Sequence, residues 1–346
     1  MANIRDVARL AGVSISSVSN LLNNRSHQMS AQTRERIERA MATLGYRPAQ
    51  SATAPAPQAK IIGLLLPSIV NPSFSALAHA VDGAARTHRY RVLLGNAYRQ
   101  EQEEAAFIDD MFLHGVRGII VAASDIRQTH FVRAAERGMK IVSYDSPFAE
   151  PMAADSRLFD SVSMDNIAAG RLAAQHLLER GCRHIVFATE ATLTVGRSHK
   201  IDGFLSALGQ HALNERQRVI EGKASSAYGD TEMFELGLTL APRVLALVPR
   251  PDGIVAINDA LGIGLMVGLR AAGVQVPADI SVIGIDNIAL AGLAEPGLTS
   301  VRPPLAEMAQ LMVERLIGRI NNDSQPPGEF LFPPTVISRR SVKTAG

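Results

Sequence analysis

The sequence predicts an α/β protein in which a small domain of three helices precedes two Rossmann-like lobes. Two observations support this fold class. Residues 1–48 contain three short helical segments with capping residues and apolar stripes. From Ile61 onward, continuous apolar runs alternate with helical stretches, which is typical of parallel sheets covered on both faces.

The composition is that of a folded protein with more than one domain. The chain has 346 residues, of which 47% are hydrophobic and 20% charged. The single cysteine, Cys182, excludes an intrachain disulfide framework and any metal cluster built from several thiolates, and we expect neither a metal nor a cofactor. The first ten residues lack the apolar core of a signal peptide, and no apolar run reaches the roughly 18 residues of a membrane span. We therefore expect a cytoplasmic protein.

Charge is distributed unevenly along the chain. The net charge is +2, but residues 1–50 hold seven arginines against three acidic residues and so carry +4, which leaves −2 for the rest. A compact basic segment on a slightly acidic body is what binding to a phosphate backbone requires. On charge alone, the solvated face of an ordinary domain is an equally good interpretation.

The basic segment is predicted to fold as three capped helices. Asn3 caps the first helix with Asp6 three residues on, and Gly12 ends it. Ser14 caps the second helix, and Ser30 caps a third that ends at Gly45. The apolar residues of the three helices fall on one side of each and close one small core: Ile4, Val7, Ala8, Ala11, Val18, Leu21, Leu22, Ile37, Ala40, Met41 and Leu44.

The second helix presents small and polar side chains outward at its start. Because its apolar stripe faces inward, Ile15, Ser16, Ser19 and Asn20 face outward. Short side chains allow a helix to approach base edges closely and to read them by hydrogen bonds and methyl contacts. This pattern favours a helix that reads the major groove of DNA.

The motifs of this segment match a known family. Residues 3–14 read Asn-Ile-Arg-Asp-Val-Ala-Arg-Leu-Ala-Gly-Val-Ser, and Ser17-Val18-Ser19, Leu22-Asn23, Thr33-Arg34 and Leu44-Gly45-Tyr46-Arg47-Pro48 follow. Together they resemble the N-terminal signature of the LacI/GalR family of transcription regulators, with its helix-turn-helix. The resemblance implies a sequence-specific DNA-binding regulator, which we expect to be a repressor.

The resemblance also assigns roles in DNA binding. It implies that Ile15 and Ser16 touch bases, that Asn20 lies in the major groove, and that four further residues lie near phosphates: Ser14, Ser19, Asn23 and Arg34. A core role for Ile15 is the alternative, but the inward stripe is already filled.

A linker of residues 49–60 follows the predicted helix-turn-helix domain of residues 1–48. It contains no apolar side chain larger than alanine between Pro48 and Lys60. Related regulators usually form a hinge helix here, with an arginine and a leucine that wedges into the minor groove. Thr53 stands at the arginine position and Pro55 at or beside the leucine position, so we expect at most one helical turn before Pro55.

The body, residues 61–346, is predicted to form two lobes. The strand candidates are Ile61–Leu66, Arg91–Leu94, Gly118–Ala122, Lys140–Tyr144, Ser161–Met164, His184–Ala188, Gly253–Ile257 and Ser281–Ile285. The arrangement resembles the periplasmic-binding-protein fold, in which the chain crosses between lobes three times. We expect crossings near Ser161, Asn287 and Asn321, with lobe 1 at about 61–161 and 288–321 and lobe 2 at about 162–287 and 322–346.

Polar residues follow several of the predicted strands, where loops of two such lobes face each other. The resemblance makes them candidates for an effector site: Asn71, Phe74, Ser124, Asp145 and Asp165 from lobe 1 and the first crossing, and Arg197, Lys200, Asn258 and Asp286 from lobe 2. Paired carboxylates and amides suit the vicinal hydroxyls of a sugar, although a nucleobase is an alternative effector. A cap, turn or packing role is the alternative for each residue alone.

Other functions fit the sequence less well. Gly262-Ile-Gly264-Leu-Met-Val-Gly268 misses the spacing of a dinucleotide-binding fingerprint, and we interpret it as close helix packing. No metalloprotease, nucleophile-elbow or phosphate-loop motif occurs, which argues against an enzyme. A free small-molecule-binding protein would explain the body but not the basic helices.

We expect the chain to bind a near-palindromic operator as a homodimer, because one helix-turn-helix reads half a site. The segments Phe74–His88 and Glu101–Gly115 of lobe 1 are the predicted contact helices.

Overall fold

The structure is a computed structural model that describes residues 3–22, 29–44, 46, 60–122, 129–145, 158–191, 194–209, 218–223, 230–322 and 324–344. The chain divides into two compact units, residues 1–59 and residues 60–346. Each unit is described separately below.

The first unit contains the three predicted helices, α1 (Ile4–Ala11), α2 (Ile15–Leu22) and α3 (Ala31–Thr43). Asn3 and Asp6 form a reciprocal capping box on α1, and Gly12 ends this helix with a φ of 63°. The side chain of Ser30 accepts the amide of Thr33 at the start of α3. A small core of Val7, Ala8, Ala11, Val18, Ile37 and Ala40 joins the helices.

Arg36 adds an interaction that the sequence did not predict. Its guanidinium on α3 donates to the carbonyl oxygen of Ala11 at 2.5 Å and to that of Gly12 at 2.9 Å. A cation therefore satisfies the free carbonyls at the end of α1. Arg36 stabilises the fold of this unit and leaves fewer arginines available to bind phosphate than the charge count suggests.

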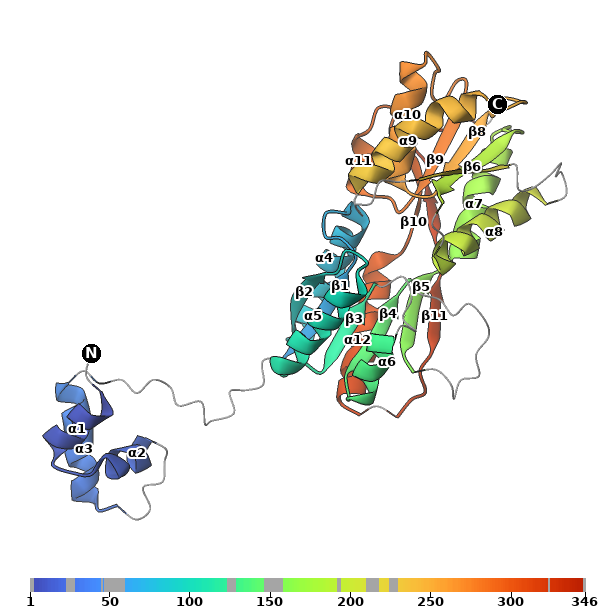
Figure 1. Ribbon diagram of the computed structural model, residues 1–346. Coiled ribbons are helices and arrows are strands. Elements are labelled where there is room, and N and C mark those ends of the chain that lie inside the picture. The colour runs from blue at the N-terminus through green and yellow to red at the C-terminus, as the bar shows by residue number, and fades with distance from the viewer. Residues whose placement is uncertain are drawn as a thin grey trace. The chain divides into compact units, whose positions relative to one another are not determined.

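The second unit has two six-stranded sheets (Figure 1). The first has the order β11-β5-β4-β3-β1-β2 and is parallel throughout, with strands β1 (Ile61–Leu66), β2 (Arg91–Asn96), β3 (Gly118–Val121), β4 (Lys140–Tyr144), β5 (Asp160–Met164) and β11 (Glu329–Phe332). Its helices are α4 (Pro72–Thr87), α5 (Glu101–Leu113), α6 (Thr129–Glu136) and α12 (Leu305–Ile320).

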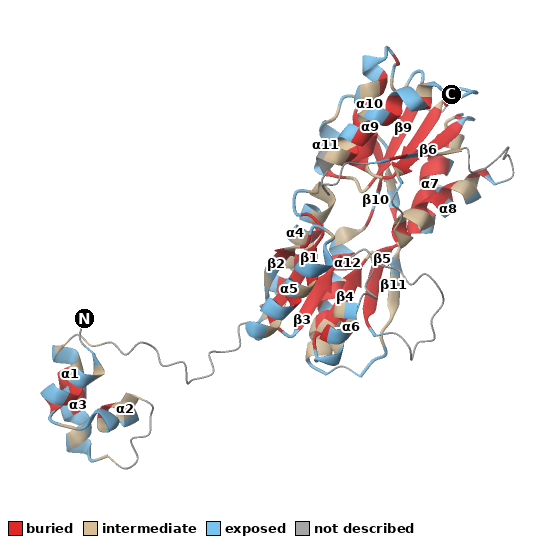
Figure 2. Ribbon diagram, in the orientation of Figure 1, coloured by how far each residue is buried: buried red, intermediate tan, exposed pale blue. Residues whose placement is uncertain are grey.

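The second sheet has the order β12-β10-β9-β8-β6-β7 and is parallel except for the edge strand β12, which pairs antiparallel with β10. Its strands are β6 (Ile185–Glu190), β7 (Val219–Gly222), β8 (Gly253–Ala256), β9 (Ser281–Ile285), β10 (Thr299–Arg302) and β12 (Thr335–Ile337). Its helices are α7 (Asn166–Glu179), α8 (Val195–Leu208), α9 (Asp230–Leu245), α10 (Asp259–Ala271) and α11 (Ala289–Leu293). Figure 2 shows the central strands of both sheets, such as β3, β5, β8 and β9, as buried.

The eight predicted strands all form, but the second and third predicted crossings between lobes are wrong. Strand β10 lies in the second sheet, so the chain crosses back to lobe 1 after Arg302 rather than near Asn287. Strand β11 lies in the first sheet and β12 in the second, so the last crossing falls between Phe332 and Thr335 rather than near Asn321. Strands β7, β10, β11 and β12 were not predicted, because each is short and, unlike the four-residue strands β3 and β8, is not buried along its whole length.

Glycines let several helices approach one another at backbone distance. A Cβ atom at Gly170 on α7 would lie 1.8 Å from the carbonyl oxygen of Lys200, and one at Gly203 on α8 would lie 1.9 Å from that of Ile167. A Cβ atom at Gly264 would lie 2.0 Å from the carbonyl oxygen of Phe234, which confirms the packing interpretation of the glycine motif in α10. Among the residues that the structure describes, no helix is long and apolar enough to span a membrane.

His176 makes the stability of the second unit depend on pH. It is buried on α7, and its Nε2 atom has no hydrogen-bond partner within the described ranges. Burial, assisted by the positive charge of Arg180, lowers its pKa from 6.5 to about 4. The folded state therefore favours the neutral ring. The contribution of His176 to the free energy of unfolding is fully present above pH 6.5 and is lost as the pH falls towards 4.

We expect His176→Leu to flatten this pH dependence. Between pH 6.5 and 4, the wild-type chain should lose roughly 3 kcal/mol of unfolding free energy that the variant keeps. Urea unfolding at a series of pH values measures the difference. His184→Leu, at an exposed histidine, is the control and should follow the wild type. Parallel pH profiles for wild type and His176→Leu would contradict the assignment.

Candidate functional site

The start of α2 forms the candidate DNA-binding surface. Ile15, Ser16 and Asn20 are exposed, and Ser19 is half-buried. Ile15 is 47% exposed, an unusual position for an isoleucine in so small a domain, which favours a contact role over a core role. Asn23 lies outside the described residues.

Ser14 organises the first turn of this helix. Its hydroxyl accepts the amide of Ser17 at 3.1 Å and lies 2.9 Å from the hydroxyls of both Ser16 and Ser17. The side chain therefore caps α2, and the cluster of three hydroxyls stays at the exposed end. Helix N-termini of this kind bind phosphate oxygens readily, because free amides and the helix dipole favour an anion there.

The predicted phosphate contact Arg34 lies on the exposed side of α3. Its Nε atom is 2.9 Å from Oε1 of Glu38, one helical turn away. Such an exposed ion pair contributes less than about 1 kcal/mol, so a phosphate can replace the carboxylate at little cost. Leu10 is also exposed, at a position that the sequence pattern did not single out.

In the second unit, a polar cluster joins the two lobes. Asp145 directly follows β4 of lobe 1 and has a φ of 52°. Its Oδ1 atom accepts a hydrogen bond of 2.8 Å from Nδ2 of Asn166 at the start of α7 in lobe 2. Gly196, at the start of α8, faces the same pair, because a Cβ atom there would lie 3.1 Å from Oδ2 of Asp145.

Asp286 directly follows β9 of lobe 2. Burial raises the pKa of Tyr144 well above its usual value, and the charges of Asp145 and Asp286 raise it further. The two charges come from different lobes, since Asp145 follows β4 and Asp286 follows β9. Asn166 is buried, and its Oδ1 atom has no hydrogen-bond partner among the described residues, so it is an acceptor that nothing described there satisfies.

Three of the predicted effector residues have a structural task. The side chains of Asn71, Asp165 and Asn258 each accept backbone amides as N-caps of α4, α7 and α10. A cap leaves lone pairs on the side chain, but its orientation is set by the helix.

The remaining candidates differ in their surroundings. Phe74 is half-buried and packs against the core of the body. Arg197 forms an ion pair with Glu190, and both side chains are mostly buried. Lys200 is only 7% exposed. Ser124 lies outside the described residues. The site includes Tyr144 and Asn166, which were not predicted from the sequence although Asn166 directly follows the predicted Asp165.

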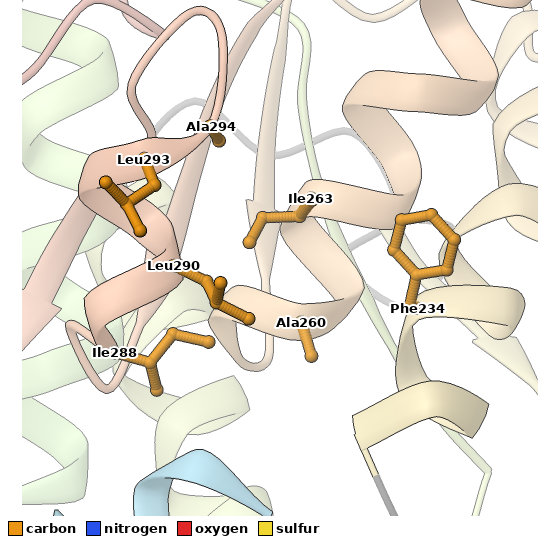
Figure 3. Close-up of a pocket in the computed structure, with 7 residues that line it drawn as sticks. All are labelled: Phe234, Ala260, Ile263, Ile288, Leu290, Leu293 and Ala294. Atoms are coloured by element: carbon orange, nitrogen blue, oxygen red, sulfur yellow. The ribbon is translucent and has the colours of Figure 1, made fainter.

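Lobe 2 also contains an apolar pocket (Figure 3). It is lined by Phe234, Ala260, Ile263, Ile288, Leu290, Leu293 and Ala294, from α9, α10 and the segment of α11. Within the described ranges, no three histidine, cysteine or acidic residues are placed to hold a metal ion.

Comparison with known proteins identifies both units. The family described as bacterial regulatory proteins of the lacI family matches residues 3–49, and a periplasmic binding protein-like domain matches residues 174–342. The transcriptional regulator GalS of Salmonella typhimurium is 31% identical over 347 residues, which cover 99% of this chain and 97% of that protein.

Two solved structures of regulators share the fold. The complex of the transcriptional regulator CelR with cellobiose has a TM-score of 0.71 at 25% identity and covers 99% of this chain and 100% of that chain. A LacI family regulator from Enterococcus faecium with bound ribose has a TM-score of 0.70 at 26% identity, over 82% of this chain and 99% of that one. Because the helix-turn-helix, the two-lobed body and the match to a full-length relative all agree, the chain belongs to the LacI/GalR family of DNA-binding transcription regulators.

Proposed function

We propose that this chain is a cytoplasmic repressor that binds a near-palindromic operator as a homodimer and responds to a sugar-like effector between its lobes. The hydrogen bond between Asp145 and Asn166 is the observation that carries the proposal, because it joins the two lobes, and Asp286 supplies a second carboxylate after a strand of lobe 2. A ligand held there would change how the lobes lie relative to each other, and a ligand can shift a conformational equilibrium only through such differential contacts.

The chemistry of the cluster favours a polyhydroxyl ligand. Two carboxylates accept hydrogen bonds, and the amide of Asn166 both donates and accepts, which matches neighbouring hydroxyl groups on a sugar ring. The two similar regulators with cellobiose and with ribose bound give the same indication.

Purified full-length chain tested against the promoter region beside its own gene examines the proposal directly. Sequence-specific binding that changes on adding ribose, cellobiose or another sugar supports it. A response to nucleobases but not to sugars would overturn the effector class while leaving the regulator intact. Equal affinity for the promoter and for scrambled DNA would overturn the proposal as a whole.

For the DNA-binding domain, we expect base-reading and phosphate-binding residues to separate in one set of titrations. Substituting Ser16 or Asn20 by alanine should change the order of preferred operators, at about 1–3 kcal/mol for each side chain that no longer reaches a base. Arg34→Ala should weaken all sequences alike and lower the slope of affinity against salt by about one unit.

Binding is measured on operator and scrambled DNA at several salt concentrations. Arg39→Ala is a matched control, because Arg39 is another exposed arginine of α3 in an i,i+4 ion pair, here with Glu35. The docking of α2 is wrong if Asn20 variants lose affinity uniformly and Arg34 variants change base preference.

For the effector site, Asp286→Ala and Lys200→Ala should weaken effector binding about tenfold or more while leaving affinity for operator in the absence of effector unchanged. The reason is that removing a hydrogen bond to a charged group costs about 1.5–3 kcal/mol. Calorimetry with the sugar that alters operator binding measures the change. Asp202→Ala, at an exposed carboxylate on the same helix as Lys200, should bind the sugar normally. Wild-type affinity in both site variants would remove these residues from the site.

The homodimer is supported by an exposed apolar edge of lobe 1. Strand β2 ends the first sheet, and its Leu93 and Leu94 are exposed. Helix α4 packs against β2 on one side, and Phe107 of α5 covers Gly95 on the other. An unpaired edge with exposed leucines, flanked by the two predicted contact helices, favours association with a second copy.

We expect Leu94→Glu to convert the dimer to a monomer, since a buried, unpaired carboxylate at the contact is costly. Sedimentation at micromolar concentration measures the state. Leu331→Glu is a matched control at the opposite edge of the same sheet, where Leu331 of β11 is 54% exposed compared with 45% for Leu94. A wild-type monomer, or a Leu94→Glu dimer, would contradict this contact.

A further inference from the structure

The turn after β9 has an unusual backbone. Asp286 and Asn287 have φ angles of 107° and 52°, two consecutive non-glycine residues with positive φ. Residues other than glycine rarely adopt such angles, and two such residues in succession persist only where the surrounding structure holds them. Asp286 also follows β9 of lobe 2 as Asp145 follows β4 of lobe 1, and both charges raise the pKa of Tyr144.

Three successive amides of this turn are bound by neighbouring groups. The amide of Asp286 donates to the carbonyl oxygen of Val301 at 2.9 Å. The amide of Asn287 donates to the hydroxyl of Ser300 at 3.0 Å, and the amide of Ile288 donates to Oδ2 of Asp259 at 2.8 Å. The turn is therefore fixed to β10 on one side and to the start of α10 on the other.

Asp259 and Ser300 act as one unit. The Ser300 hydroxyl donates to Oδ1 of Asp259 at 2.6 Å, so Asp259 holds the turn both directly and through Ser300. Gly284 makes room for this carboxyl group, since a Cβ atom there would lie 2.2 Å from its Oδ1. Neither Asp259 nor Ser300 has any exposed surface, so neither is placed to touch a ligand.

The position of Asp259 is electrostatically unfavourable. Burial raises its pKa well above the usual range, and the charge of Asp286 raises it further. A carboxyl group beside another carboxylate in a buried site is a poor choice for stability alone. Its hydrogen bonds to the Ile288 amide and to the Ser300 hydroxyl indicate that it fixes the backbone of the turn.

Arg339 holds the turn at a fourth point. Its Nη2 atom donates to Oδ1 of Asn287 at 2.6 Å, while its Nη1 atom donates to the carbonyl oxygen of Leu298. Arg339 follows β12, which the chain enters after its last crossing from lobe 1. The turn thus contacts β10, after which the chain leaves lobe 2 at the second crossing, and Arg339, which follows the return of the chain to lobe 2 at the third crossing.

We propose that Asp259 and Ser300 are positioning residues that hold the Asp286–Asn287 turn in its left-handed conformation and so direct the Asp286 carboxylate toward the effector, without touching the effector themselves. This inference rests on the proposed function of the interlobe cluster. It predicts that effector affinity is set in part by two residues without solvent access.

Matched serine variants test the inference on the full-length chain. Ser300→Ala and Ser341→Ala each remove a fully buried hydroxyl with two hydrogen bonds in lobe 2, but Ser341 binds Thr299 and Val282 rather than the turn. Calorimetry with D-ribose and with cellobiose should show about tenfold weaker binding for Ser300→Ala and unchanged binding for Ser341→Ala. Equal reductions in affinity in the two variants would overturn the proposal.

A double-mutant cycle asks whether Ser300 acts through Asp286. In the Asp286→Ala background, Ser300→Ala should cause no further reduction of sugar affinity, because the carboxylate that it positions is gone. The same comparison with Asp259→Asn should give the same result. Additive reductions would mean that Ser300 and Asp259 act on the site by another route, which would overturn the positioning role.

Hydrogen exchange on the unliganded chain supplies a readout that does not depend on the effector. Ser300→Ala should speed exchange of the Asn287 and Ile288 amides about tenfold relative to Ser341→Ala. Exchange at wild-type rates in Ser300→Ala would overturn the positioning role. If faster exchange occurs in a chain that binds neither ribose nor cellobiose, the positioning role stands and the proposed effector class fails for these sugars.

Discussion

The architecture of the body depends on one constraint: the central strands of both sheets are covered on both faces. Strands β3, β5, β8 and β9 are buried along their whole length. The two candidate carboxylates lie instead at residues that follow strands. Asp145 follows Tyr144 directly, and Asp286 follows Ile285 in the same way. The interlobe cluster is the place where the strand ends of the two lobes meet.

The same constraint explains what could be predicted from the sequence. Strands β1, β4 and β9 are mostly buried and mostly apolar, and their predicted bounds are those of the structure. Edge strands such as β11 and β12 are short and half-exposed, so their sequences resemble those of loops, and the lobe boundaries were misplaced with them. The rule that ligand residues follow strands selected Asp145 and Asp286, which stay predictions, and also selected the N-caps Asn71 and Asn258, because a helix that starts after a strand needs a cap at the same position.

Contacts between distant segments were beyond the reach of the sequence. The caps of the first unit were predicted correctly because Asn3 and Asp6 are three residues apart, whereas Arg36 binds carbonyl groups 24 and 25 residues away. Asn166 was missed for the same reason, since its partner Asp145 lies in the other lobe.

As a regulator of this family the chain is not an enzyme, and the glycine motif of α10 that resembles a nucleotide-binding fingerprint serves helix packing.

The backbone contact between α7 and α8 has a consequence for anyone who would redesign the effector specificity of this regulator. At Gly170 and Gly203 the two helices lie so close that any larger side chain would push them apart. These two positions should therefore stay glycine in any library of variants. At the starts of the same helices, Asn166 donates to Asp145, and a Cβ atom at Gly196 would lie 3.1 Å from Oδ2 of Asp145 and 3.2 Å from Nδ2 of Asn166. Selection for new effectors should therefore vary the helix starts and leave the glycine contact unchanged, which keeps the two helices a rigid support for whatever site is built on their ends.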